Sequence, residues 1–271
     1  MVTDFEYDGV LLSEVGYALV SFDGIKDGEI DTDSQISFNH TSTMHGKYQP
    51  FSSYAYEDVL KMEFYIGKNM CLFETAQENF DYNISVSDMA FLKRWLSRTT
   101  PHILRAIGDD SYNGIFWKGS FVVEEYTLGD NRIGAHLTFE CDAPFGYMEG
   151  VVFRGDLESN GVFEYNCTSD EIGYIYPDLT ILLKGSGDLT IKNTHDNRET
   201  TIKNCENNEI ITITKNMQIS SSIESHKIMN DFNFVFYRVC NSFNNVKNTL
   251  ISNLPIEFVI KYNPYAKVVI V

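Results

Sequence analysis

The sequence predicts a mainly β protein of 271 residues, and three observations support this fold class. Short segments in which apolar and polar residues alternate recur along the chain, separated by Gly, Asn and Asp. Aromatic residues make up 14% of the chain, and they favour pleated, half-buried surfaces. Only one stretch has a convincing helical pattern. The length allows one large β domain or two ordinary ones.

The first half of the chain shows strand patterns on both sides of a polar region. The segment 5–12 alternates, and 16–20 offers a second strand. An acidic loop over 23–33 and a long exposed segment over 34–50 follow. Further strands are expected at 60–67, 103–107, 115–118, 120–126 and 135–141, with Gly119 as a break between the two central ones.

The single predicted helix begins near residue 85. Ser85 and Asp88 have the spacing of a capping box, and Ser87 is the alternative N-cap. Pro101 ends the segment. The apolar stripe that follows the cap comprises Phe91, Leu92, Trp95 and Leu96. Such a stripe predicts packing against a core.

The second half is predicted to consist of short strands alone. They are expected at 179–183, 188–192, 209–214, 217–220, 232–239, 256–262 and 267–271. This density of strands and turns is typical of a β-sandwich. The pattern breaks at 143–146, so the predicted domains are 1–149 and 150–271.

A protein that binds the phosphates of a nucleic acid needs a positive charge, whereas the formal net charge of this chain is −17. Sequence-specific nucleic-acid binding is therefore disfavoured. Residues 1–150 hold 24 acidic and 10 basic residues (−14), whereas 151–271 hold 14 and 11 (−3). No apolar run is long enough for a membrane helix, and no signal peptide is visible. The five cysteines are widely spaced without a CxxC pair, which predicts buried free thiols.

Signatures of catalysis and of metal or cofactor binding are absent from the sequence. The GxSxG, GxGxxG and Walker A patterns do not occur, and His40 and His45 lack metal-ligand spacing. The segment 185–188 predicts a strand-connecting turn. The adjacent acids at 109–110 and at 124–125 point to opposite faces if they lie in strands, so neither pair supplies two facing carboxylates. His136 is expected to pack across strands. We therefore expect no enzyme, no cofactor and no metal.

Strand-and-turn segments in both halves occur in a characteristic order. They are 5–10, 13–16, 89–96, 137–146, 176–181, 208–213, 231–238, 248–250 and 260–264. In this order the chain resembles the distal tail protein family of siphophages, particularly the type that infects Gram-positive hosts.

The resemblance implies an N-terminal β-sandwich or barrel-like ring-forming domain with one helix, and a C-terminal galectin-like β-sandwich. It implies a homo-oligomeric ring, usually a hexamer, at the tail tip of the virion. The ring would contact the tail tube protein and a tail-associated hub or fibre protein, and receptor-binding proteins would attach through the outer domain. The family has no catalytic residues to carry over.

The acidic excess of the first half suggests a role in such a ring. A negatively charged channel wall repels DNA and lets it slide through. The candidate channel or ring-contact acids are Asp23, Asp27, Glu29, Asp31 and Asp33.

Other functions remain as alternatives. A carbohydrate-binding module predicts a monomer with affinity for cell-wall glycans, and a tail-tip glycan depolymerase predicts two carboxylates at glycosidase separation. A tail tube protein or another baseplate ring predicts a single domain or stacked tubes. The candidate exposed aromatics for sugar stacking are Trp117, Tyr174, Tyr176 and Tyr265.

Overall fold

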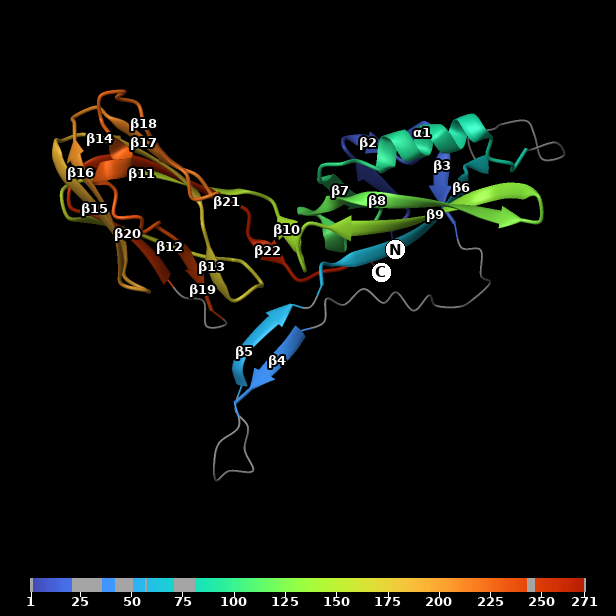
Figure 1. Ribbon diagram of the computed structural model, residues 1–271, viewed down its shortest axis with the longest axis horizontal. Coiled ribbons are helices and arrows are strands. Elements are labelled where there is room, and N and C mark those ends of the chain that lie inside the picture. Colours follow the sequence, from blue (N-terminus) through green and yellow to red (C-terminus); the bar gives the residue numbers. More distant parts are fainter. Residues whose placement is uncertain are drawn as a thin grey trace. The chain divides into compact units, whose positions relative to one another are not determined.

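A computed structural model describes residues 2–20, 36–41, 51–56, 58–70, 81–242 and 247–270. The chain forms two compact units (Figure 1). Unit 1 comprises Met1–Tyr147 together with Lys267–Val271, and unit 2 comprises Met148–Ala266. The short strands β10 (Gly146–Met148) and β22 (Tyr265–Ala266) lie where the chain passes between the units. The predicted acids at 23–33 lie outside the described residues.

Unit 1 is built on an antiparallel sheet in the order β2-β1-β7-β8-β9-β6-β3. Its strands are β1 (Asp4–Tyr7), β2 (Val10–Leu11), β3 (Tyr17–Leu19), β6 (Lys61–Lys68), β7 (His102–Ile107), β8 (Ile115–Leu128) and β9 (Asn131–Cys141). Short 3-10 helices span Ser13–Val15 and Asp110–Tyr112. A separate two-stranded sheet pairs β4 (Ile36–His40) with β5 (Phe51–Tyr56), so the predicted long exposed segment contains a strand.

Helix α1 (Val86–Leu96) covers one face of the unit 1 sheet (Figure 1). Ser85 is its N-cap. The Ser85 hydroxyl accepts from the Asp88 N–H, and the Asp88 carboxylate accepts from the Ser85 N–H, which confirms the predicted capping box. Met89, Leu92, Trp95 and Leu96 are buried against aromatic residues of the sheet. The helix therefore closes the core of unit 1, as its apolar stripe predicts.

Strand β8 runs without interruption through Gly119, so the predicted break at this glycine is wrong. Gly119 pairs with Cys141 on β9, and a Cβ at position 119 would lie 2.0 Å from the backbone oxygen of Glu140. The glycine is therefore needed for close approach of two backbones within the sheet rather than for a turn.

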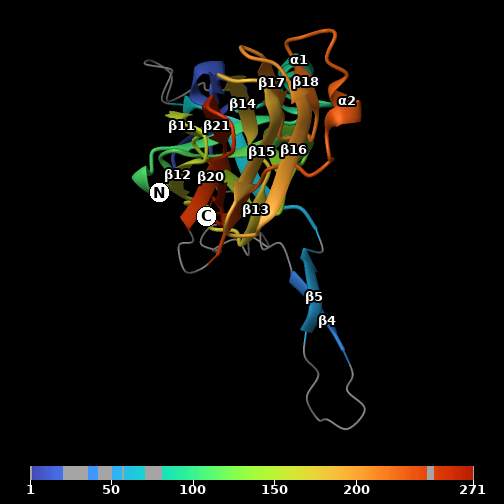
Figure 2. The same cartoon turned by 90° about the vertical axis from the view of Figure 1, so that its left-hand side faces the viewer.

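Unit 2 is a β-sandwich of a 5-stranded and a 4-stranded sheet (Figure 2). The first sheet contains β11 (Val151–Leu157), β21 (Ile256–Tyr262), β14 (Asp178–Leu183), β17 (Ile210–Ile213) and β18 (Ile219–Ser221). The second contains β12 (Gly161–Asn166), β20 (Lys247–Ser252), β15 (Gly187–Asn193) and β16 (Arg198–Cys205). A two-stranded ribbon pairs β13 (Gly173–Ile175) with β19 (Val239–Asn241), and α2 (Ile228–Asp231) is one short helix. Both sheets contribute to one apolar core.

Two predicted strands of the second half are wrong. In 232–239 only Phe232 forms a bridge, to Ile202, before β19 begins at Val239. Phe234 adopts a positive φ of 58°, which interrupts an extended strand. Residues 267–270 form no strand, and Ile270 packs into the core of unit 1 instead. Strands β11, β12, β13 and β16 were not predicted.

Candidate functional site

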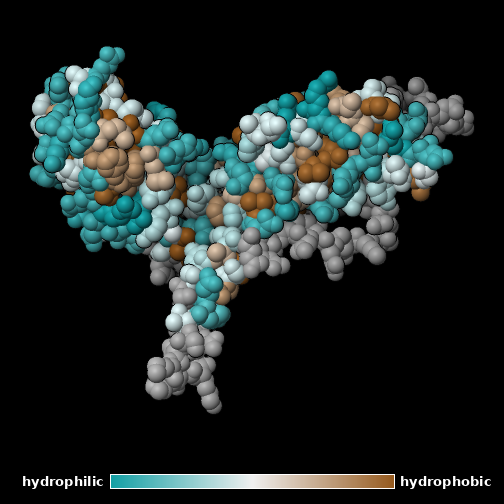
Figure 3. Space-filling view, viewed as in Figure 1, coloured by the Kyte–Doolittle hydropathy of each residue, from teal (hydrophilic) through white to brown (hydrophobic). Residues whose placement is uncertain are grey.

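The β4–β5 hairpin presents one apolar face. Ile36 pairs with Tyr56 and Phe38 pairs with Tyr54, which places these four side chains on the same side of the two-stranded sheet. Ile36, Phe38 and Tyr54 are 40%, 48% and 54% exposed. In the space-filling view such apolar residues are scattered over a mainly hydrophilic surface (Figure 3). We call these four residues the hairpin face.

The opposite side of the hairpin is polar. The Asn39 amide donates to the Ser53 hydroxyl at 3.0 Å, and the Ser37 hydroxyl donates to the Ala55 carbonyl at 3.3 Å. Apolar and polar side chains thus alternate along both strands. This pattern is typical of a sheet that has one face toward water and one face toward an apolar surface. Isolated two-stranded hairpins are marginally stable. The hairpin face is therefore a candidate contact surface for another protein chain.

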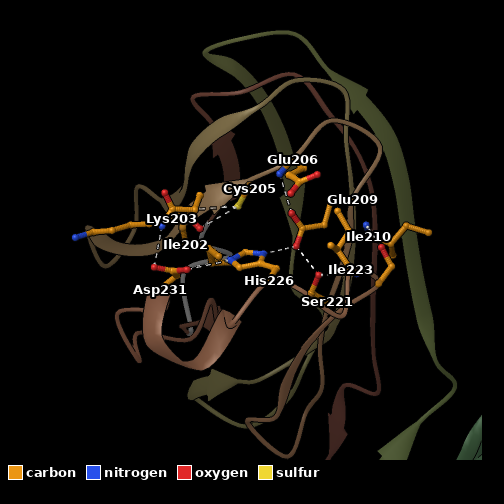
Figure 4. Close-up of polar contacts among 12 residues, drawn as sticks. Ile202, Lys203, Cys205, Glu206, Glu209, Ile210, Ser221, Ile223, His226 and Asp231 are labelled. Carbon is orange, nitrogen blue, oxygen red and sulfur yellow. Dashed lines mark hydrogen bonds and ion pairs between the residues drawn. The ribbon is translucent and has the colours of Figure 1, made fainter.

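A cluster of buried polar side chains lies in unit 2 (Figure 4). Glu209 is fully buried, and its Oε1 accepts from the Ser221 hydroxyl at 2.5 Å and lies 2.5 Å from His226 Nδ1. Its Oε2 accepts from the Glu206 N–H at 2.8 Å. His226 Nε2 lies 3.4 Å from Asp231 Oδ2. The cluster thus ties the segment that leads into α2 to the start of β17.

The chemistry of this cluster is that of a structural anchor. Burial raises the pKa of Glu209, but the hydrogen bonds from Ser221, Glu206 and His226 outweigh it and hold the pKa below its ordinary value. Ser221 and His226 both bind the carboxylate, and no hydrogen bond joins them to each other. A nucleophilic serine needs the histidine as its base, and this arrangement does not provide it. The cluster could not be predicted from the sequence, because its members lie in separate segments.

The carboxylate pairs singled out in the sequence are separated by the fold. Glu124 lies 3.3 Å from His136, whereas Glu125 pairs with Arg132 at 2.6 Å and with Lys93 at 3.7 Å. Asp109 caps the 3-10 helix that begins at the adjacent Asp110. The prediction that strand neighbours face opposite sides is therefore confirmed for Glu124 and Glu125, whose partners differ.

Other sequence predictions can be compared with the described residues. The ring of His136 stacks on Tyr65 across strands with centroids 4.7 Å apart, as predicted. Residues 184–186 connect β14 to β15, so the turn predicted at 185–188 is present but ends in the first two residues of β15. The four cysteines among the described residues are buried and free, and burial raises the pKa of the Cys205 and Cys240 thiols to about 12. These thiols therefore stay protonated at neutral pH.

The predicted exposed aromatics differ in their surroundings. Trp117 is fully buried in unit 1, so its selection as an exposed ring is wrong. Its indole reaches a hydrogen-bond acceptor inside the unit, which is the usual way to bury a tryptophan. Tyr176 and Tyr265 are partly buried. Tyr174 is 51% exposed, and the Arg238 guanidinium carbon lies 3.4 Å from its ring centroid.

Within the described ranges, no group of three or more His, Cys, Asp or Glu side chains is placed to hold a metal ion. None of the described helices is long and apolar enough to span a membrane.

Two family models together match most of the chain. A family model described as a phage tail protein N-terminal domain matches residues 1–143, and one described as a phage tail C-terminal domain matches residues 145–262. The chain belongs to this family of phage tail proteins. No curated protein matches the sequence.

A solved structure shares the fold of this tail protein. The Dit protein of phage SPP1, described as a paradigm of the hub adsorption apparatus in phages that infect Gram-positive bacteria, superimposes with a TM-score of 0.64. The likeness covers 97% of this chain and 99% of Dit, at 11% sequence identity. Both units therefore follow the Dit fold, which agrees with the resemblance to distal tail proteins.

Proposed function

We propose that this phage tail protein forms a homo-oligomeric ring at the tail tip, where it joins the tail tube to the hub and lets DNA pass through a central channel. The observation that carries the proposal is the match to Dit over both units, end to end. We further propose that the ring is a hexamer, and that its neighbours are the tail tube protein, a tail-associated hub or fibre protein and receptor-binding proteins, as the resemblance to distal tail proteins implies. The proposal includes a galectin-like fold for unit 2. It also includes domain limits at 1–149 and 150–271.

The hairpin face supplies a contact surface for such a ring. A second copy of the chain would cover Ile36, Phe38 and Tyr54, which remain 40–54% exposed in the single chain. Ring closure buries sheet surfaces that otherwise favour disordered association. The acids Asp23, Asp27, Glu29, Asp31 and Asp33 are the proposed channel or ring-contact residues, on the basis of the −14 charge of residues 1–150.

The oligomeric state tests the ring. Light scattering across a concentration series, with negative-stain images of the same fractions, should show a rise from 31.0 kDa to a closed multiple with a central hole. A protein that stays monomeric at every concentration, also when mixed with a tail tube protein, would contradict the ring.

Substitutions on the hairpin test the contact surface. Phe38→Glu and Tyr54→Glu should each shift assembly to higher concentration, because a charge on the apolar face resists burial. Val162→Glu is the matched control, since Val162 is 53% exposed but lies in unit 2. If the control impairs assembly as strongly as the hairpin variants, the hairpin face is not the contact.

A further inference from the structure

A groove lies on the face of the unit 1 sheet that α1 does not cover. Val123 of β8 points into the core that α1 closes, so its neighbour Val122 points to the opposite face, where it is 50% exposed. The groove has a volume of about 660 Å³, and its lining includes Val122, Gly119, Val59 and Pro101. Sites of about 300–1,000 Å³ take whole drug-sized ligands, so this groove has room for more than one aromatic side chain.

The charged residues in the lining of the groove already have partners within the chain. Arg98 Nη2 lies 3.6 Å from Asp8 Oδ2, and Glu140 Oε1 lies 3.0 Å from Lys61 Nζ. The Asp142 carboxylate accepts a hydrogen bond of 2.9 Å from a tyrosine hydroxyl. A charged ligand would have to compete with these internal pairs. The groove therefore favours an uncharged occupant with apolar or aromatic side chains.

The hairpin face has this chemistry. Strands β4 and β5 contain no Asp, Glu, Lys or Arg, and three of the four side chains of the hairpin face are 40–54% exposed. The Tyr54 side chain adds a hydroxyl, which needs a hydrogen-bond partner when it is buried. The hydroxyl groups of Ser97 and Thr99, which are exposed residues in the lining of the groove, offer such partners. The hairpin face and the groove are therefore complementary.

The two surfaces belong to different segments of the same unit. A contact between unlike surfaces of two copies is heterologous and can close into a ring, whereas a hairpin-to-hairpin contact would join two copies and stop at a dimer. We propose that the hairpin face of one copy occupies the groove of the next copy, with Phe38 and Tyr54 packed against Val122. This inference rests on the proposed ring, and it identifies the second surface that the contact between copies requires.

Photo-crosslinking of the full-length protein tests this pairing. Phe38→p-benzoyl-phenylalanine keeps an aromatic side chain on the hairpin, and under ultraviolet light this side chain bonds to C–H groups that it touches. Gel bands at multiples of 31.0 kDa are expected, and mass spectrometry should place the bond in residues 97–101 or 119–122 of a second copy. Val162→p-benzoyl-phenylalanine is the control, since Val162 is 53% exposed in unit 2, and it should give no bond to these residues.

The variant Val122→Glu tests the groove by its effect on assembly. A charge in the groove resists burial, so the protein concentration needed for ring formation should rise about tenfold or more. Leu128→Glu is the matched control and should assemble like the unaltered protein, because Leu128 is 68% exposed on the same strand but lies outside the groove. Circular dichroism establishes that both variants are folded. If Val122→Glu does not fold, the cross-link decides.

The outcomes separate this contact from the ring itself. If rings form but the cross-link from position 38 falls outside the groove, or only within its own chain, the pairing is overturned and the ring stands. The pairing is also overturned if folded Val122→Glu assembles as readily as Leu128→Glu. An unaltered protein that stays monomeric at every concentration would overturn both the ring and the pairing.

Discussion

The indole Nε1 of Trp117 donates a hydrogen bond of 3.1 Å to the backbone oxygen of Val268, 151 residues later in the chain. The Tyr112 hydroxyl makes a similar bond of 3.2 Å to Val269, and Ile270 is 5% exposed in the core of unit 1. After completing the sandwich of unit 2, the chain thus returns to unit 1. The stability of unit 1 is therefore expected to depend on residues far from it in sequence.

Substituting Ile270 by alanine tests this dependence. The change removes buried methyl and methylene groups, so the free energy of unfolding of unit 1 should fall by about 2–4 kcal/mol. Trp95 and Trp117 both lie in unit 1, so tryptophan fluorescence in a urea titration measures this unit. Ile210→Ala, at a 42% exposed isoleucine of unit 2, should change the fluorescence midpoint little. Equal midpoints for Ile270→Ala and the unaltered protein would show that the returning segment contributes nothing.

Gly119→Ala should destabilise unit 1 more than a glycine substitution at the tip of the same hairpin. The new Cβ would meet the Glu140 backbone oxygen at 2.0 Å, so β8 and β9 must move apart at a cost of about 3 kcal/mol. Gly129 has a φ of +62° and open space around it, so Gly129→Ala should cost only about 1 kcal/mol. Urea unfolding of both variants measures the difference. Similar losses would refute the role given to close backbone approach.

The N-cap of α1 offers a smaller and more local test. Ser85→Ala removes the hydroxyl that accepts from the Asp88 N–H and should reduce the free energy of unfolding by about 1 kcal/mol. Ser87→Ala is the control, because Ser87 contacts the Ser85 hydroxyl but does not cap the helix. It should cost less than about 0.5 kcal/mol. If Ser87→Ala lowers the free energy of unfolding more than Ser85→Ala does, then Ser85 is not the N-cap.

The helix and its cap could be predicted because their signals lie within a dozen neighbouring residues. The same holds for strands with clear alternation, such as β6 and β9. The position of Ile270 could not be predicted, since an apolar segment has the same local pattern whether it forms a strand or fills a distant core. The interruption of the predicted strand at Phe234 could not be predicted either, because a positive φ at a phenylalanine has no sequence signature.

The residues of the candidate sites could likewise be predicted only in part. Tyr174 could be predicted as an exposed aromatic from its residue type, but its partner Arg238 lies far from it in the sequence. The Glu209 cluster joins three segments that are each unremarkable in sequence. Pairing of the hairpin strands fixes which aromatic side chains share a face, and the sequence alone did not reveal that pairing.

The buried carboxylate of Glu209 should make the stability of unit 2 sensitive to acid. Its folded-state pKa lies below the ordinary 4.5, because hydrogen bonds from Ser221, Glu206 and His226 favour the charged form over the cost of burial. The stabilisation is therefore complete above about pH 4.5 and is lost as the pH falls through the folded-state pKa. Glu209→Gln should lower the free energy of unfolding at pH 7 by about 3 kcal/mol.

The same variant should also flatten the pH dependence, because glutamine has no proton to gain. Urea unfolding followed by circular dichroism from pH 7 to pH 3 measures both effects. Glu164→Gln is the matched control, since Glu164 is 56% exposed in its pair with Lys247, and such surface pairs contribute about 0–1 kcal/mol. A Glu209→Gln protein that loses stability with acid as steeply as the unaltered chain would show that another group controls the response.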